Sequence, residues 1–390
     1  MLFGYCFLSV VYLFILSLWG RFFYSRKEWG TSDAAARRIA ILVPAYKEDN
    51  VIRSTADNLL ALDYPRDRYD IYIIADSFRP ETLRELDKMP LNLMEVSFEN
   101  STKAKALNEA FRRIDTKYDI ALICDGDNML ANNFLKKVNE AFAGGAKAVQ
   151  GRRVAKNLDS SFAILDACSE AINNHIFRKG TNAIGLSSAI CGSGMAFQYD
   201  MVKEILSEID AVGGFDKVLQ LNIVKRRDFI YYLDDAIAFD EKVDSPVAFS
   251  QQRKRWISSQ FIYARRFFLP AFREVFKGNF SYFNLAVANY SLLPKAFLMV
   301  LLPALAFAGF YLRLGLGEAA TGLCGLYFFS LFIALPPVLI NANLLQAIFA
   351  LPRAVVLMFG ALLQSKKADQ RFIHTPHTKT GISNPGERGF

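Results

Sequence analysis

Long stretches without a charged side chain lie at both ends of this 390-residue chain, and they limit its possible folds more than any other feature. Residues 1–20 and 296–311 contain no Asp, Glu, Lys or Arg, and the same is true of residues 319–352. A helix needs about 20 mostly apolar residues to cross a bilayer. We therefore expect one transmembrane helix at residues 1–20 and a transmembrane region of two or three helices at residues 290–364.

The first apolar stretch could instead be a cleaved signal peptide, but no positive charge precedes it and residues 19–23 do not form a small-residue cleavage site. Arg21, Arg26 and Lys27 follow it, and positive charge usually stays on the cytoplasmic side. We therefore expect residues 35–250 to be a cytoplasmic domain of an integral inner-membrane protein.

The segments that follow the central domain are also consistent with a position on the cytoplasmic side of the membrane. Residues 251–280 form an aromatic and basic amphipathic region, with a helix expected from Gln251 to Phe268 on the membrane surface. The tail at residues 365–390 is basic, which favours a cytoplasmic position and an even number of crossings after the central domain. Residues 344–364 contain Arg353 beside Pro352, so this segment could lie in the interface, re-enter or span.

The amino-acid composition limits the kinds of partner that the chain can bind. The net charge of +8 suits an anionic membrane surface or anionic ligands. No basic helix or aromatic-basic repeat in the central domain indicates nucleic-acid binding. The five cysteines have no metal-binding or redox spacing, which fits a reducing compartment. The three histidines also lack such spacing, and we read His175 as an ordinary helix residue and His374 and His377 as parts of the tail.

Strand-like and helix-like patterns alternate through the first part of the central domain. Ile39–Val43 and Ile120–Cys124 are continuous apolar runs of strand length, and amphipathic helical patterns separate the strands. Such alternation predicts an α/β fold with a mostly parallel, Rossmann-like sheet covered on both faces. The other expected elements are strands at 69–75, 93–96, 195–198 and 231–239, and helices at 49–62, 81–88, 105–114, 160–178 and 218–226.

Two carboxylates follow the strand at residues 120–124 directly, in Asp125-Gly126-Asp127. In open α/β sheets this edge is where ligands bind. Hard carboxylate oxygens suit Mg²⁺ or Mn²⁺, which usually bridge to phosphate oxygens. The alternative is a surface turn, for which the same residues are well suited.

Other polar residues stand where neighbouring strands end. Pro44, Tyr46 and Glu48 follow the first strand, so that an aromatic ring could stack on a base and a carboxylate could accept from a nucleoside; the alternative is a turn that stops the strand. Asp76 ends the second strand, a usual place to bind a nucleotide's sugar. Its alternative is a helix N-cap, which Ser77 could also provide.

Further along the chain, Lys103 and Lys105 stand at the start of a helical pattern, where a lysine could neutralise a diphosphate or could simply be solvated. Asp216 opens another helical pattern, either as a general base or as a helix cap.

Gln252, Arg255 and Trp256 share one helix face. An arginine there could bind a diphosphate, and a tryptophan could form a flat wall for a sugar. The alternative is an interfacial helix whose Arg and Trp meet lipid headgroups.

In this order, the motifs resemble those of inverting family-2 glycosyltransferases with the GT-A fold, the branch that includes membrane-bound cellulose, chitin and hyaluronan synthases and many bacterial polysaccharide enzymes. The resemblance covers about residues 38–260 and the membrane layout. It implies that Pro44, Tyr46, Glu48 and Asp76 bind the nucleoside, that Lys103 rather than Lys105 is the motif lysine, and that Asp127 binds the metal while Asp125 contacts the nucleotide. It also implies that Gly192 and Ser193 lie near the acceptor, that Asp216 is the catalytic base, and that Gln252, Arg255 and Trp256 form the Gln-x-x-Arg-Trp motif.

Two positions depart from the family pattern. Phe215 stands where an acidic residue usually precedes the base, and a single Asp follows the second strand where relatives often have two.

The resemblance implies transfer of a sugar from a nucleotide sugar, with UDP the expected nucleotide, to a lipid-linked or polysaccharide hydroxyl at the cytoplasmic membrane face. A processive polysaccharide synthase, acting as a homo-oligomer or with an export partner, is the first alternative. A non-catalytic nucleotide-binding membrane sensor or transport subunit is the second.

Overall fold

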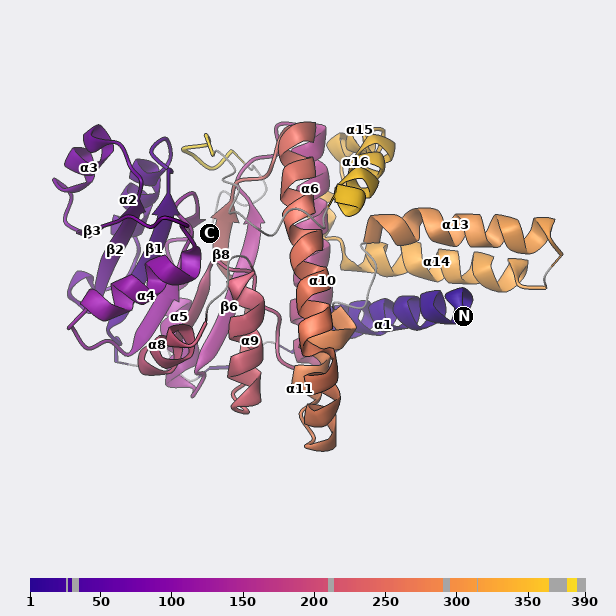
Figure 1. Ribbon diagram of the computed structural model, residues 1–390, viewed down its shortest axis with the longest axis horizontal. Coiled ribbons are helices and arrows are strands. Elements are labelled where there is room, and N and C mark those ends of the chain that lie inside the picture. The colour runs from indigo at the N-terminus through magenta and orange to yellow at the C-terminus, as the bar shows by residue number, and fades with distance from the viewer. Residues whose placement is uncertain are drawn as a thin grey trace.

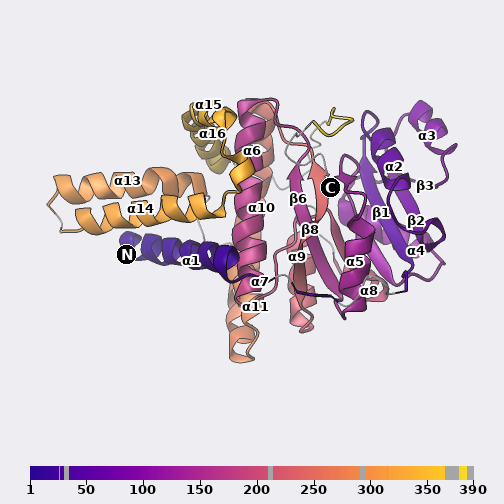
Figure 2. The same ribbon diagram turned by 180° about the vertical axis from the view of Figure 1, so that it is seen from behind.

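The computed structural model describes residues 1–25, 27–29, 35–209, 214–289, 295–313, 315–364 and 377–383. A mixed sheet with its covering helices forms one side of the molecule, and a bundle of apolar helices forms the other (Figures 1 and 2). Two long helices, α6 and α10, stand side by side between them and run across the direction of the apolar bundle (Figures 1 and 2). The sheet and the apolar helices therefore meet on this helix pair.

The sheet has eight strands within the described residues, in the order β3-β2-β1-β4-β7-β6-β8-β5. The strands are β1 (Ile39–Tyr46), β2 (Tyr69–Asp76), β3 (Asn92–Val96), β4 (Ile120–Ile123), β5 (Met129–Leu130), β6 (Ala148–Ala155), β7 (Met195–Gln198) and β8 (Ile230–Asp240). β3, β2, β1 and β4 run parallel, as do β6 and β8, whereas β7 is antiparallel to both of its neighbours and β5 to β8. The mostly parallel α/β sheet is confirmed, with a second half in which parallel and antiparallel pairs are mixed.

Both faces of the first half of the sheet are buried, which explains its continuous apolar strands. Ala40 and Leu42 point into one core, together with helices α4 (Lys103–Arg113), α8 (Tyr199–Ser207) and α9 (Phe215–Lys225). Ile39 and Ile41 point into the other core, together with α2 (Ile52–Leu60) and α5 (Phe134–Ala143). A shorter helix, α3 (Pro80–Leu86), precedes β3. The carboxyl ends of β1, β2 and β4 therefore lie at one common edge.

The two central helices begin with ordinary capping signals. α6 (Ser161–Asn174) starts after Ser160, whose Oγ accepts from the N–H of Ala163 at 3.1 Å, and it continues as a π-helical segment η2 (His175–Gly180) and a short α7 (Thr181–Ala183). α10 (Pro246–Phe276) starts after Ser245, with a proline in its first turn. It therefore begins five residues before the expected Gln251 and ends beyond Phe268; α11 (Phe280–Phe283) and η3 (Asn284–Ala288) follow.

Among the described residues, two helices are long and apolar enough to cross a membrane, α1 (Leu2–Phe22) and α14 (Gly317–Ala334). α13 (Lys295–Tyr311) is slightly shorter and lies beside α14 (Figures 1 and 2). α15 (Ala342–Ile348) and α16 (Leu351–Gln364) meet at 51°, so that they could form one broken crossing or a re-entrant segment. α15 packs against α6 and α16 against α10. The number of crossings stays a prediction.

Candidate active site

A cavity of about 590 Å³ lies where the edge formed by β1, β2 and β4 faces α6 and α10. Twelve of the thirteen residues expected in the site line it: Pro44, Tyr46, Glu48, Asp76, Lys103, Asp125, Asp127, Gly192, Asp216, Gln252, Arg255 and Trp256. The thirteenth, Ser193, is fully buried behind the lining, where its Oγ accepts from the N–H of Asp125 at 2.9 Å. Residues spread over more than 200 positions of sequence therefore share one cavity.

At the end of β2, the structure decides between the two readings of Asp76. The N-cap of α3 is Arg79, whose N–H donates to Asp49 Oδ1 at 2.8 Å, so the capping alternative for Asp76 and Ser77 is wrong. Asp76 is instead buried at the cavity wall, where the Ser77 hydroxyl donates to it at 2.9 Å. The role of Asp76 in binding a nucleotide stays a prediction.

The two lysines at the start of α4 point in different directions. Thr102 caps the helix, and Lys103 reaches into the cavity, where its ammonium contacts Asp125 and donates to the carbonyl of Gly192 at 2.6 Å. Lys105 is exposed and donates to the carbonyl of Asn100 at 3.1 Å. The structure therefore places Lys103 in the cavity and Lys105 in solvent, as the motif spacing indicates.

The Asp125-Gly126-Asp127 segment is a turn and also part of the cavity. The N–H of Asn128 donates to the carbonyl of Asp125 at 3.1 Å, which closes the turn, and Lys156 donates to the carbonyl of Asp127 at 2.9 Å. A Cβ at Gly126 would lie 2.8 Å from that of Ala45, so only glycine fits without a shift. The alternative of a surface turn is therefore right about the turn but wrong about the surface, because Asp127 is only 5% exposed.

Negative charge accumulates around Asp127. Burial raises its pKa to about 6, the charges of Asp240, Asp125 and Glu48 act in the same direction, and the positive charge of His377 opposes them. No three His, Cys, Asp or Glu side chains within the described ranges form a ready-made metal centre. Mg²⁺ and Mn²⁺, however, are commonly held by one or two carboxylates and completed by substrate phosphates. The crowded carboxylates at Asp127 and Asp125 fit such a cation.

His377 lies in the cavity, so its reading as a residue of the tail is wrong. Its Nδ1 lies 2.9 Å from Glu48 Oε1, and burial lowers its pKa less than the charges of Asp127, Glu48 and Glu241 raise it, to about 10. Residues 377–383 are held by Glu241, whose carboxylate accepts from the N–H groups of Thr378 and Lys379 at 3.0 and 2.8 Å. The spacing of the histidines gave no signal of this contact, and His374 lies outside the described residues.

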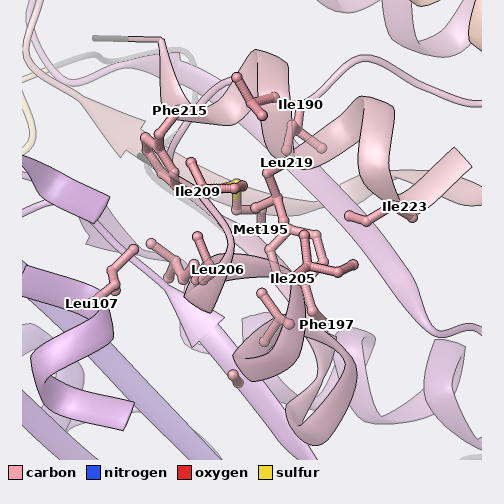
Figure 3. Close-up of a cluster of buried hydrophobic side chains, with 14 of the residues drawn as sticks. Leu107, Ile190, Met195, Phe197, Ile205, Leu206, Ile209, Phe215, Leu219 and Ile223 are labelled. Carbon is pink, nitrogen blue, oxygen red and sulfur yellow. The ribbon is translucent and has the colours of Figure 1, made fainter. Parts of the chain in front are cut away.

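Asp216 stands in the first turn of α9. The N-cap is Gly214, with a positive φ of 64°, and no side-chain capping bond forms, so the capping alternative for Asp216 is wrong. Phe215, Leu219 and Ile223 form the buried face of α9 and pack near Met195 and Phe197 of β7 and Leu206 of α8 (Figure 3). Asp216 is half-buried and lines the cavity.

The Gln-x-x-Arg-Trp residues lie on α10, and both of their alternative readings have support. Gln252 and Arg255 line the cavity, and burial lowers the pKa of Arg255. Trp256 also lines it and is 37% exposed. Between them, Arg253 pairs with Asp166 of α6 and lies 4.4 Å from the centre of the Trp256 ring. This buried pair fixes α10 against α6.

The comparisons with known proteins agree with this geometry. The family model described as "Glycosyltransferase like family 2" matches residues 36–259, more than half of the chain. Among solved structures, a mannosyltransferase from Pyrobaculum calidifontis in complex with GDP-Man and Mn²⁺ is similar in fold, with a TM-score of 0.52, 18% identity and coverage of 86% of this chain and 97% of that one. The matched domain assigns the chain to the class of glycosyltransferases, and the solved structure shows that the two chains share a fold.

Curated relatives share part of the sequence. A beta-monoglucosyldiacylglycerol synthase from Nostoc sp. is 25% identical over 233 residues, which are 56% of this chain and 48% of the relative. A cellulose synthase from Novacetimonas hansenii is 31% identical over 100 residues, 25% of this chain and 6% of the relative. The chain spans about half the length of the first of these. It belongs to the family 2 glycosyltransferases.

Proposed function

We propose that this protein is an inverting glycosyltransferase that moves a sugar from a UDP-sugar to a hydroxyl group of a lipid-linked acceptor at the cytoplasmic face of the cell membrane. The observation that carries the proposal is the cavity itself. Its lining runs from the strand ends that hold Asp76 and Asp127 to α6 and α10, which contact the apolar helices. A nucleotide donor and a membrane-bound acceptor can therefore meet within it.

The donor would occupy the end of the cavity beneath β1 and β2. Tyr46 could stack on the base, and Glu48 and Asp76 could accept from the nucleoside. Lys103 and Arg255 both line the cavity and would neutralise the diphosphate. A divalent cation held by Asp127 and Asp125 would supply charge stabilisation to the leaving nucleoside diphosphate.

Asp216 would take the proton of the acceptor hydroxyl. The oxygen of that hydroxyl would form the new bond to the anomeric carbon as the bond to the diphosphate breaks on the opposite face, which inverts the configuration. Asp216 lines the cavity and makes no capping bond in α9, so its carboxylate can face the acceptor, with the charge of Lys217 beside it. The proposed roles of the site residues rest on this placement.

A donor screen tests the proposal. Purified full-length protein is given UDP-glucose, UDP-N-acetylglucosamine or GDP-mannose with Mn²⁺ or Mg²⁺, and release of UDP or GDP is measured. Metal-dependent release with one donor supports a transferase of this kind. Binding of every donor without hydrolysis or transfer would refute it.

Asp216→Asn tests the base. This variant should bind the donor with normal affinity but transfer no sugar, because an amide cannot accept the proton. Asp200→Asn, at an exposed position in the first turn of α8, is the matched control and should turn over normally. Normal transfer by Asp216→Asn would remove this residue from the mechanism.

A processive synthase is the second candidate, because Gln252, Arg255 and Trp256 lie in the cavity wall. The small apolar bundle favours a single addition, since one chain with few crossings offers little space for a polymer channel. Product length from purified enzyme in detergent separates the two: one added sugar supports the lipid-linked acceptor, and a ladder of products supports the synthase.

A further inference from the structure

The far end of the cavity borders the apolar helices. We call it the membrane end and define it by Asn173, Phe177, Arg178 and Asn289, which all line the cavity. The Tyr12 hydroxyl of α1 donates to Asn289 Oδ1 at 2.9 Å. A molecule that occupies this end can therefore keep its tail among the apolar helices.

The two ends of the cavity carry opposite charge. Around Asp127 the carboxylates dominate, as described above. Next to the membrane end, besides the Arg253–Asp166 pair, four cations stand close to Glu170 and to Asp240, which also acts on Asp127: Arg153, Arg178, Lys242 and Lys295. Glu170 accepts from Arg178 at 2.9 Å and from Arg153 at 2.8 Å, so one carboxylate serves two guanidinium groups.

Some of the donors at this end have no acceptor. The Nε–H groups of Arg153 and Arg178 are buried and make no hydrogen bond with the part of the chain that is described, although Arg153 Nε lies 3.7 Å from Asp240 Oδ2. Arg178 lines the cavity, so an occupant of the membrane end could reach its guanidinium group. Buried donors on a charged group are costly when unsatisfied. The excess of cations and the free donors therefore both favour an anion as the occupant.

The fold holds Arg178 rigidly in this place. It belongs to the π-helical segment η2, and such segments often occur at functional sites. A Cβ at Gly180 would lie 2.3 Å from the carbonyl oxygen of Leu16, so η2 lies directly on the backbone of α1. His175 Nε2 lies 2.9 Å from the carbonyl oxygen of Ser17, which adds a second attachment. The anion site is therefore preorganised by a helix of the apolar bundle.

We propose that the acceptor carries a phosphate group, which Arg178 binds at the membrane end of the cavity while the reacting hydroxyl lies on the side of Asp216. The acceptor is thus an anionic phosphate-bearing membrane lipid rather than a neutral glycerolipid or a growing glucan. This inference rests on the proposed function and specifies its acceptor. The same group could bind the donor diphosphate or free phosphate, and the test distinguishes these sources.

The test compares two lipids that differ only by the phosphate, dioleoyl phosphatidic acid and dioleoylglycerol. Each is added to the purified full-length enzyme in uncharged detergent micelles, and affinity is obtained from the ligand-induced rise in melting temperature. We expect phosphatidic acid to bind at least about tenfold more tightly, since a hydrogen bond to a charged group contributes about that much. Arg178→Gln should remove most of this preference.

Matched controls separate the site from surface attraction. Arg273→Gln lies on the exposed side of α10 and should leave the preference unchanged. In Arg178→Gln, Glu170 still pairs with Arg153, so the fold should persist; Lys295→Gln, which replaces the neighbouring cation, is the second variant if it does not. The preference for phosphatidic acid should fall in either variant.

Three results would overturn the proposal. The first is equal affinity for the two lipids. The second is an unchanged preference in Arg178→Gln. The third is a parallel loss of UDP or inorganic phosphate binding in that variant, which would assign the arginine to the donor or to free phosphate. Nucleotide release in the donor screen tests the proposed function separately, because it needs no lipid.

Discussion

Replacing Asp127 by asparagine should make the metal-free protein more stable while it abolishes the effect of the metal. The carboxylate is 5% exposed, and burial together with Asp240, Asp125 and Glu48 raises its pKa from 3.8 to about 6. Each unit of pKa difference corresponds to about 1.4 kcal/mol. Keeping Asp127 ionised at neutral pH therefore costs about 3 kcal/mol, which the neutral amide of Asp127→Asn would recover.

The pH dependence has a defined sign. A carboxyl group with a raised pKa binds its proton more tightly in the folded state, so its destabilising effect is full above pH 6 and disappears as the pH falls through 6 towards 3.8. The metal-free wild-type protein should gain stability from pH 7.5 to pH 5 relative to Asp127→Asn. The difference between the two proteins isolates this residue from all other titrating groups.

Thermal unfolding in detergent measures both effects. At roughly 2 °C per kcal/mol for a domain of this size, Asp127→Asn should melt several degrees higher without metal at pH 7.5. Mn²⁺ with UDP should raise the melting temperature of the wild type but not of the variant. A lower melting temperature in the metal-free variant would refute the crowding of negative charge around Asp127. A rise in its melting temperature with Mn²⁺ and UDP, equal to that of the wild type, would refute the assignment of Asp127 as the metal-binding carboxylate.

Three further substitutions test other parts of the structure. Lys103→Met should weaken UDP binding about tenfold or more, because it removes the ammonium group beside Asp125. Lys105→Met, at an exposed lysine, should leave UDP binding unchanged. Equal losses of UDP affinity in titrations of the two variants would contradict the assignment of Lys103 to the donor site. His377→Ala should destabilise the metal-free protein at pH 7, and this loss of stability should shrink as the pH rises towards 10, because the stabilising contribution of His377 depends on its bound proton. Melting curves of the variant and the wild type at pH 7 and 9.5 measure the loss, and an equal loss at both pH values would argue against a charged histidine. Gly180→Ala should lower the free energy of unfolding by about 1–3 kcal/mol, because the added Cβ forces η2 away from α1. Gly185→Ala is the control, since a Cβ at Gly185 meets no neighbour and strains only its own backbone. Equal melting temperatures of Gly180→Ala and the wild type would show that the contact between η2 and α1 is looser than described.

Local patterns in the sequence were enough to place most of the elements that form the site. The continuous apolar runs at β1 and β4 are buried on both faces, and the polar residues that follow them do meet at one edge. The second half of the sheet was harder to predict. β5 has two residues, and β6 contains Arg152 and Arg153, whose charges conceal a buried strand from any search for apolar runs.

The residues that sequence reasoning missed depend on long-range contacts. His377 reaches Glu48 across 329 positions of sequence, and no spacing within the tail indicates such a contact. Arg178 and Glu170 lie within one helical segment, but their importance depends on Arg153, which comes from β6. By contrast, the choice of Lys103 over Lys105 followed from the resemblance to the family motif, and helix geometry agrees with it only in placing the two lysines on different faces.

The contact between α1 and η2 bears on how this enzyme could be re-engineered. Gly20 and Gly180 meet with almost no space between them, and the π-helical turn that carries Arg178 is shaped to this one helix surface. The N-terminal helix is therefore not an interchangeable anchor. Exchanging it for another apolar helix of equal length would keep an apolar N-terminal helix but remove the surface on which the segment that carries Arg178 rests. In a chimaera of two relatives, α1 and residues 175–180 should therefore come from the same parent.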